Sequence, residues 1–155
     1  KNISWDVLWL VAGGIALGLA LEKSGLATRL VTLIPFSGLS ALTVLIISAF
    51  VGLLMANFMS NTGTANLLLP IVAALGTSGL ALDSTGGIAG VILGVTLSIS
   101  LGMSLPISTP PNALAHATGE IQTPDMARAG VVIGLIGLGL VIALILLLTS
   151  IGFFK

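Results

Sequence analysis

The sequence lacks cysteine, and only 6% of its 155 residues are charged. Without cysteine the chain can form no disulfide, no thiolate metal site and no thiol nucleophile. A soluble domain carries about 25% charged residues, so the charge content falls far below that of an ordinary globular protein. The formal net charge is zero and no basic run occurs, which argues against nucleic-acid binding.

What the chain contains instead is apolar sequence. Hydrophobic residues make up 56% of it, and its mean hydropathy is +1.22. No charge occurs between Arg29 and Asp83, between Asp83 and Glu120, or between Arg128 and Lys155. A helix that spans a membrane needs about 17–25 predominantly apolar residues, and these intervals supply them. We therefore expect an all-α, multi-pass integral membrane protein.

The first 38 residues predict one spanning helix followed by an interfacial segment. Residues 1–23 contain an apolar run with Trp5 and Trp9 near its start, where aromatic side chains favour the membrane interface. Residues 24–38 follow directly after Glu22 and Lys23, contain Arg29 and then leucines at helical spacing, and are too short to span. An amphipathic helix along the membrane surface and an ordinary loop both fit this second segment.

A polar but uncharged cluster interrupts the apolar sequence of residues 39–79. It occupies residues 55–66 and reads MANFMSNTGTAN. If both flanking halves spanned the membrane, the cluster would be an external turn, where Lys, Glu and Asp are common. A re-entrant hairpin, with its tip buried in protein, explains the lack of charge better. Asn57 and Asn66 flank this tip, and either hydrogen bonds within the hairpin or direct ligand binding fits them.

A second polar break lies within residues 86–118, where LPISTPPNA occupies residues 105–113. Its three prolines lack N–H donors, so carbonyl groups four residues earlier lose their helical partners. Thr109 is suited to cap a new short helix, with Pro110 at its first position. The sequence therefore predicts a helix broken by proline. After it, residues 120–128 are expected to form a charged connector, and residues 127–154 a long final spanning helix.

The two breaks together predict a site for an anion beside a cation. A helix N-terminus presents free N–H groups and a partial positive charge, so helix starts near Asn61 and Pro110 suit an oxyanion without Arg or Lys. Carbonyl groups at a helix C-terminus suit a hard cation such as sodium. The groups expected to bond the anion are the hydroxyls of Ser60, Thr62 and Thr109 and the amides of Asn61 and Asn112. The expected sodium ligands are the carbonyls of Ala56, Met59 and Ser108 and the side-chain oxygen of Asn61.

The tripeptide Ser60-Asn61-Thr62, followed by Thr-Pro-Pro-Asn at 109–112, resembles the divalent anion:sodium symporter family. That family includes bacterial and animal di- and tricarboxylate transporters, and the resemblance covers nearly the whole chain. It implies the C-terminal part of the second of two inverted repeats, in a protein of the cell membrane (inner or plasma) that is not an enzyme. It also implies sodium-coupled uptake of C4-dicarboxylates such as succinate, by an elevator motion in a homodimer. Sodium would be the coupling ion, with no other cofactor.

The same resemblance implies how the chain is divided and which residues bind. Residues 1–23 would be a scaffold helix, residues 24–38 the arm that follows it, and residues 39–155 part of the transport domain. Only one Ser-Asn-Thr is present, so we expect this chain to be part of a longer symporter, with the N-terminal repeat as its missing partner. The resemblance carries substrate contact onto Ser60, Asn61, Thr62, Thr109 and Pro110. It carries a sodium site onto Asn61 and the largely backbone oxygens of Ala56, Met59 and Ser108.

Other functions remain open at this level. A sodium-independent dicarboxylate exchanger, a transporter of sulfate or another oxyanion, and a passive anion channel would use the same breaks. An intramembrane serine hydrolase would need Ser104 or Ser60 beside His116, and the chain has only this one histidine and no nucleophile-elbow pattern. His116 is either a proton-coupling or selectivity group, or a satisfied polar residue near an interface. Ser98, Ser100 and Ser104 are expected to bond their own helix backbone.

Overall fold

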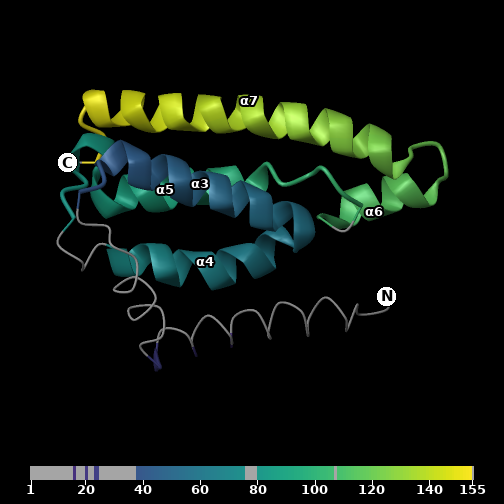
Figure 1. The fold of residues 1–155 in the computed structure, drawn as a ribbon, viewed down its shortest axis with the longest axis horizontal. Coiled ribbons are helices and arrows are strands. Elements are labelled where there is room, and N and C mark those ends of the chain that lie inside the picture. The colour runs from purple at the N-terminus through teal and green to yellow at the C-terminus, as the bar shows by residue number, and fades with distance from the viewer. Residues whose placement is uncertain are drawn as a thin grey trace.

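The computed structural model describes residues 16, 20, 23–24, 38–75, 80–106 and 108–154. The spanning helix expected at 1–23 and the interfacial segment expected at 24–38 lie almost wholly outside these residues. Within the described part of the chain all regular structure is helical, which confirms the all-α prediction there (Figure 1). Its elements are α3 (Ala41–Phe58), α4 (Asn61–Leu75), the short 3-10 helix η1 (Asp83–Thr85), α5 (Gly87–Ser100), α6 (Pro110–Ala117) and α7 (Thr123–Ser150).

Two of the described helices are long and apolar enough to cross a membrane. These are α3, with 18 residues, and α7, with 28 residues. At about 1.5 Å of rise per residue they reach roughly 27 and 42 Å, against a hydrocarbon core about 30 Å thick. The helices α4 and α5 are apolar but shorter, with 15 and 14 residues. This composition agrees with a helical membrane protein.

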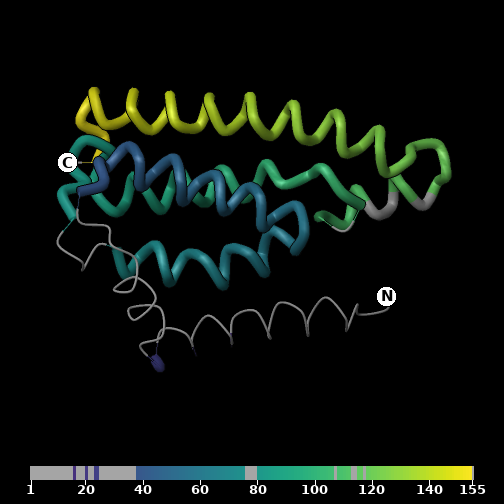
Figure 2. Tube along the Cα trace, in the orientation of Figure 1, coloured from purple at the N-terminus to yellow at the C-terminus, as the bar shows by residue number. Residues whose placement is uncertain are grey.

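The helices α3, α4 and α5 pack side by side, with α3 most extensively against α5. Figure 2 follows the chain along α3, back along α4, and forward again along α5, so α4 is antiparallel to both neighbours. Glycine permits the close approach of α3 and α5, since a Cβ on Gly94 would lie 2.6 Å from the Leu45 side chain. The fully buried core between these helices includes Val44, Ala56, Val72, Val91 and Val95.

The last helix, α7, covers α3 and α5 with a face that is rich in glycine. Gly134 faces the side chain of Leu53, and Gly137 lies against Leu101. Further along, Ile145 is completely buried. The opposite face of α7 is apolar and open, with large side chains more than half exposed at Val132, Ile136, Leu140 and Leu147. An apolar outer surface of this kind suits contact with lipid.

The structure shifts the boundaries expected for the last helix. We expected a charged connector at 120–128 and a helix at 127–154, but α7 already begins at Thr123 and ends at Ser150. Pro124 stands in the first turn, where its missing N–H costs nothing, and Asp125 complements the positive end of the helix dipole. At the other end, Gly152 adopts a positive φ of 78° and ends the helical path.

Candidate functional site

The turn between α3 and α4 brings polar groups to a helix start. Met59 is extended, with φ −126° and ψ 168°, which ends α3. The Oγ of Ser60 then accepts the N–H of Gly63 at 3.0 Å, and the Ser60 carbonyl accepts the N–H of Thr64 at 2.9 Å. Ser60 therefore caps α4, which begins at Asn61 as the sequence predicts. Because the hydroxyl oxygen accepts this bond, its own hydrogen is available to a ligand.

The start of α6 repeats this arrangement. Thr109 is extended and its Oγ1 accepts the N–H of Asn112 at 3.4 Å, while Pro110 is the first helical residue. The cap expected from the sequence is thus confirmed. Again the cap hydroxyl accepts a backbone bond and keeps its hydrogen for donation. Two helix N-termini of the described chain, each with a hydroxyl cap, follow the two polar breaks.

The helix break, defined as residues 101–109, is held in shape by Asn112. Its Nδ2 donates to the carbonyl of Met103 at 2.8 Å and to that of Leu105 at 3.2 Å. These bonds satisfy carbonyls that the broken helix leaves without partners. Both amide hydrogens are used in this way, so the side chain of Asn112 has no donor left for an anion. The anion contact expected from this amide is therefore corrected to a supporting role in the break.

The hairpin turn and the helix break lie against each other. Asn57 Oδ1 accepts the N–H of Ser104 at 2.8 Å, and Ser108 Oγ donates to the Asn57 carbonyl at 2.9 Å. Close by, a Cβ on Gly102 would fall 2.5 Å from the Cβ of Ala56, so the two backbones nearly touch. None of these three contacts was predicted from the sequence. The polarity of Asn57 was visible there, but its partners lie 47 and 51 residues away.

Four helix ends meet in this region (Figure 1). The helices α3 and α5 both end there, and α4 and α6 both begin there and run away in opposite directions. Each N-terminus carries roughly half a positive charge and each C-terminus half a negative one. The region therefore offers N–H and O–H donors to an anion and carbonyl oxygens to a cation.

The groups assigned to sodium are all oxygens, the ligand type that a hard cation prefers. Asn61 Oδ1 is buried and has no hydrogen-bond partner among the described residues. Leaving such an oxygen unsatisfied costs about 1–3 kcal/mol, and coordination of a cation would remove that cost. Ala56 and Ser108 are 0% and 1% exposed, whereas Met59 lies at the surface of the described chain. In that same part of the chain, no group of three or more His, Cys, Asp or Glu side chains exists to hold a metal.

The residues assigned to substrate differ in exposure. Ser60, Asn61 and Thr109 are half-buried, while Thr62 and Pro110 are exposed. No described contact joins the capping hydroxyls of Ser60 and Thr109 directly. The bond between Ser108 and Asn57 holds the helix break close to the hairpin turn, and these two segments carry the caps.

The remaining polar residues do not form a second reactive centre in the described structure. His116 Nδ1 hydrogen-bonds the carbonyl of Ile121 at 2.9 Å, so the partner of this ring nitrogen is backbone and not a serine. Ser98 and Ser100 donate to carbonyls of their own helix, as expected. Ser104 is different, because its Oγ is buried and has no hydrogen-bond partner among the described residues. The expectation that it bonds its own backbone was wrong: α7 covers it at Gly130, whose added Cβ would lie 2.8 Å from that Oγ.

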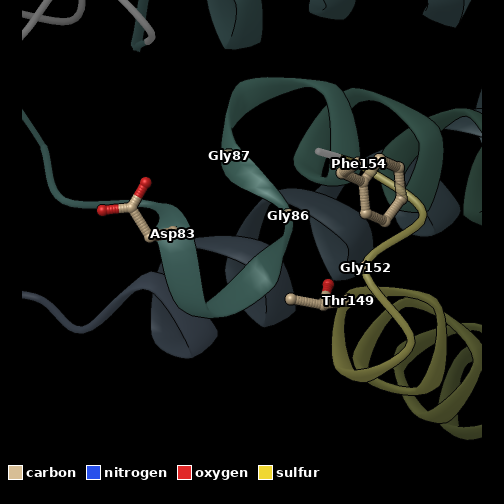
Figure 3. A pocket seen from close by; sticks show the side chains of 6 residues that line it. All are labelled: Asp83, Gly86, Gly87, Thr149, Gly152 and Phe154. Carbon is tan, nitrogen blue, oxygen red and sulfur yellow. The ribbon is translucent and has the colours of Figure 1, made fainter.

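A cavity of about 210 Å³ lies at the other end of the helices (Figure 3). Thr149, Gly152 and Phe154 from the end of the chain close it against Gly86 and Gly87. Figure 3 shows the Asp83 carboxylate at its edge, pointing away from the Phe154 ring. Far from the four helix ends, this cavity is no part of the candidate site.

Comparison with known proteins relates this arrangement to a family of transporters. Residues 1–151 match the family described as the sodium:sulfate symporter transmembrane region. The chain is 30% identical over 150 residues to the sodium-dependent dicarboxylate transporter SdcS of Staphylococcus saprophyticus. It is 34% identical over 145 residues to human solute carrier family 13 member 2, and 31% identical over 146 residues to member 4.

These alignments cover 93–94% of this chain but only 22–27% of the length of the three relatives. The family match nevertheless extends over almost every residue, and it includes the hairpin turn and the helix break described above. The chain therefore belongs to the divalent anion:sodium symporter family.

Proposed function

We propose that this chain forms the anion and sodium site of a secondary active transporter that takes up divalent organic anions with sodium. The observation that carries the proposal is the meeting of four helix ends, two of them with hydroxyl caps. The names of the relatives support it, since SdcS is described as sodium-dependent and as a dicarboxylate transporter.

The substrate is a dianion with a negative group at each end, such as succinate. One carboxylate lies at the N-terminus of α4, against Ser60, Asn61 and Thr62. The other is directed toward the N-terminus of α6, against Thr109 and Pro110. Backbone N–H groups and neutral hydroxyls suit this task in lipid, because they attract an anion without burying a counter-charge when the site is empty.

Sodium binds on the carbonyl side of the same region, at Asn61 and the backbone oxygens of Ala56, Met59 and Ser108. The unpartnered Asn61 Oδ1 supports this assignment. Cation and anion then lie a few ångströms apart in a medium of low dielectric constant, where each favours binding of the other. This mutual attraction is the physical basis of coupling.

Helix length supports a membrane arrangement in which both polar breaks lie at depth. With 14 and 8 residues, α5 and α6 are each shorter than a span of about 20 residues, so together they cross the bilayer with the break at depth. Although α3 alone is long enough to cross, its end is bonded to the break, so we infer that α3 and α4 form a hairpin that enters and leaves on one side. We infer a homodimeric elevator transporter of the plasma or inner membrane, in which this chain is the C-terminal part of the second inverted repeat.

Uptake of labelled succinate tests the proposal. The full-length protein that carries this chain is placed in proteoliposomes, with an inward sodium gradient or with choline in its place. Accumulation above the external concentration only with sodium supports the symporter. Equal exchange against internal succinate in choline would replace it with a sodium-independent exchanger. Absence of succinate flux under both conditions would exclude dicarboxylate transport.

Sulfate is the second candidate substrate, because the matching family is described by sodium and sulfate. A tetrahedral dianion fits between two helix N-termini as well as a carboxylate does. Unlabelled sulfate in excess would suppress succinate uptake if sulfate were the preferred anion. Tartrate, malate or fumarate would suppress it instead if the two ends of a dicarboxylate were recognised.

A further inference from the structure

Asn57 is the residue that joins the hairpin to the broken helix, and the proposed binding assignments leave it out. Its side chain and its main chain both bond to the helix break. Oδ1 accepts the N–H of Ser104 at 2.8 Å, and the carbonyl oxygen accepts the hydroxyl of Ser108 at 2.9 Å. Two bonds from one residue restrict both sliding and rotation of α3 against the break.

The orientation of the Asn57 amide is set by its partners. Nδ2 donates to the carbonyl of Leu53 at 2.9 Å, while Oδ1 faces a backbone N–H that can only donate. A flipped amide would place two donors or two acceptors against each other, so only one orientation satisfies both sides. Ser108 is fixed as well, because its Oγ also accepts the N–H of Leu105 at 3.3 Å.

The residues that these bonds connect are next in sequence to groups assigned to the ligands. Asn57 directly follows Ala56, which carries a proposed sodium ligand. Its partner Ser108 carries another and directly precedes Thr109, the cap of α6. The proposed sodium oxygens therefore come from both the hairpin turn and the helix break, and the bonds of Asn57 set the separation between these two backbones. A cation that binds oxygens of both backbones has its highest affinity when the two backbones are already at the right separation.

We propose that Asn57 is a positioning residue that holds the hairpin turn and the helix break at the separation sodium requires. It touches neither ligand. Loss of the Asn57 side chain removes no ligand group, but it lets the hairpin turn and the helix break move apart. Sodium binding must then bring the two backbones together again, which lowers the sodium affinity. Sodium affinity should fall first, and substrate affinity should follow through coupling. This role rests on the proposed sodium-coupled transport.

The test measures succinate uptake by the full-length protein in proteoliposomes as a function of sodium concentration. Asn57→Leu keeps the side-chain size and removes its hydrogen bonds. We expect the half-saturating sodium concentration to rise about tenfold, the effect of losing the one hydrogen bond that this side chain makes to the break, with the maximal rate within about twofold of wild type. The KM for succinate should rise at limiting sodium and recover at saturating sodium. A merely destabilised protein would lose maximal rate instead.

Two further variants complete the design. Ser108→Ala removes the hydroxyl bond to Asn57, together with the longer bond from the N–H of Leu105, and should raise half-saturating sodium in the same direction by a smaller factor. In the Asn57→Leu protein, Ser108→Ala should raise half-saturating sodium little further, because both substitutions weaken the same contact between hairpin turn and helix break. Ser98→Ala is the matched control. It removes a buried bond of 2.8 Å inside α5, and its sodium dependence should equal that of wild type.

Each outcome decides one claim. If uptake depends on sodium in the same way in Asn57→Leu as in wild type, the positioning role is overturned, while the proposed symporter function is not affected. If Asn57→Leu does not fold, an unchanged sodium dependence in Ser108→Ala overturns the role, and a raised one supports it. Wild-type succinate uptake that ignores sodium would overturn the proposed function itself, together with the positioning role that rests on it.

Discussion

Alanine at Gly102 is expected to force the hairpin and the helix break apart. The added Cβ would lie 2.5 Å from the Cβ of Ala56, 2.9 Å from its carbonyl carbon and 3.0 Å from its carbonyl oxygen. None of these atoms is at the end of a flexible side chain, so relief requires movement of backbone. Gly102 does not have a positive φ, and alanine therefore adds no strain of its own there.

The size of the effect follows from these distances. Carbon atoms in contact lie about 3.5–4.0 Å apart, so α3 and the break would have to separate by about 1 Å. Overpacking of this kind costs about 1–3 kcal/mol of the free energy of unfolding. The displaced group includes the Ala56 carbonyl proposed to bind sodium. Gly102→Ala should therefore raise half-saturating sodium as well as lower the thermal unfolding temperature.

Thermal unfolding of the purified full-length protein and sodium-dependent uptake are the two assays. Gly139→Ala is the control, because nothing lies within 4 Å of its added Cβ and alanine favours a helix over glycine by about 0.5–1 kcal/mol. Ala56→Gly placed in the Gly102→Ala protein removes the closest contact and should restore part of the loss. If Gly102→Ala were as stable as Gly139→Ala, with unchanged sodium dependence, the close approach of hairpin and break would be refuted.

Three further substitutions test the polar groups. Asn112→Asp turns two donors toward Met103 and Leu105 into acceptors, so thermal unfolding should show a loss of about 1–3 kcal/mol; an unchanged melting curve would contradict these bonds. Thr109→Val removes the cap of α6 and should cost about 0.5–2 kcal/mol and raise the succinate KM, whereas Thr109→Ser should keep both near wild type. Asn61→Ala should weaken sodium and succinate binding together, measured by their half-saturating concentrations in uptake. A change in only one of them would show that Asn61 does not serve both ligands.

Local features of the site could be predicted from the sequence. The start of α4 at Asn61 and the cap at Thr109 depend on chemistry within three or four neighbouring residues, so side-chain type and spacing suffice. The start of α7 at Thr123 carried the same kind of signal in Pro124 and Asp125. It was missed because the charges there were interpreted as a connector, although acidic residues favour the first turn of a helix.

Long-range contacts could not be predicted in this way. Asn57 bonds to residues 47 and 51 positions away, and no periodicity in the sequence says which helix face meets which. Gly102 and Gly130 are further examples, since each is needed only because another backbone or side chain packs directly against it. The sequence predicts which groups can bind an anion or a cation, whereas tertiary packing decides which of them meet.

The central claim is that one region of four helix ends binds the anion and sodium together. Equilibrium binding of succinate to the purified full-length protein, in sodium chloride and in choline chloride, tests it most directly. We expect sodium to lower the succinate Kd by about tenfold or more, and succinate to lower the sodium Kd by the same factor, because coupling between two sites is reciprocal. An identical succinate Kd in sodium and in choline would contradict the claim.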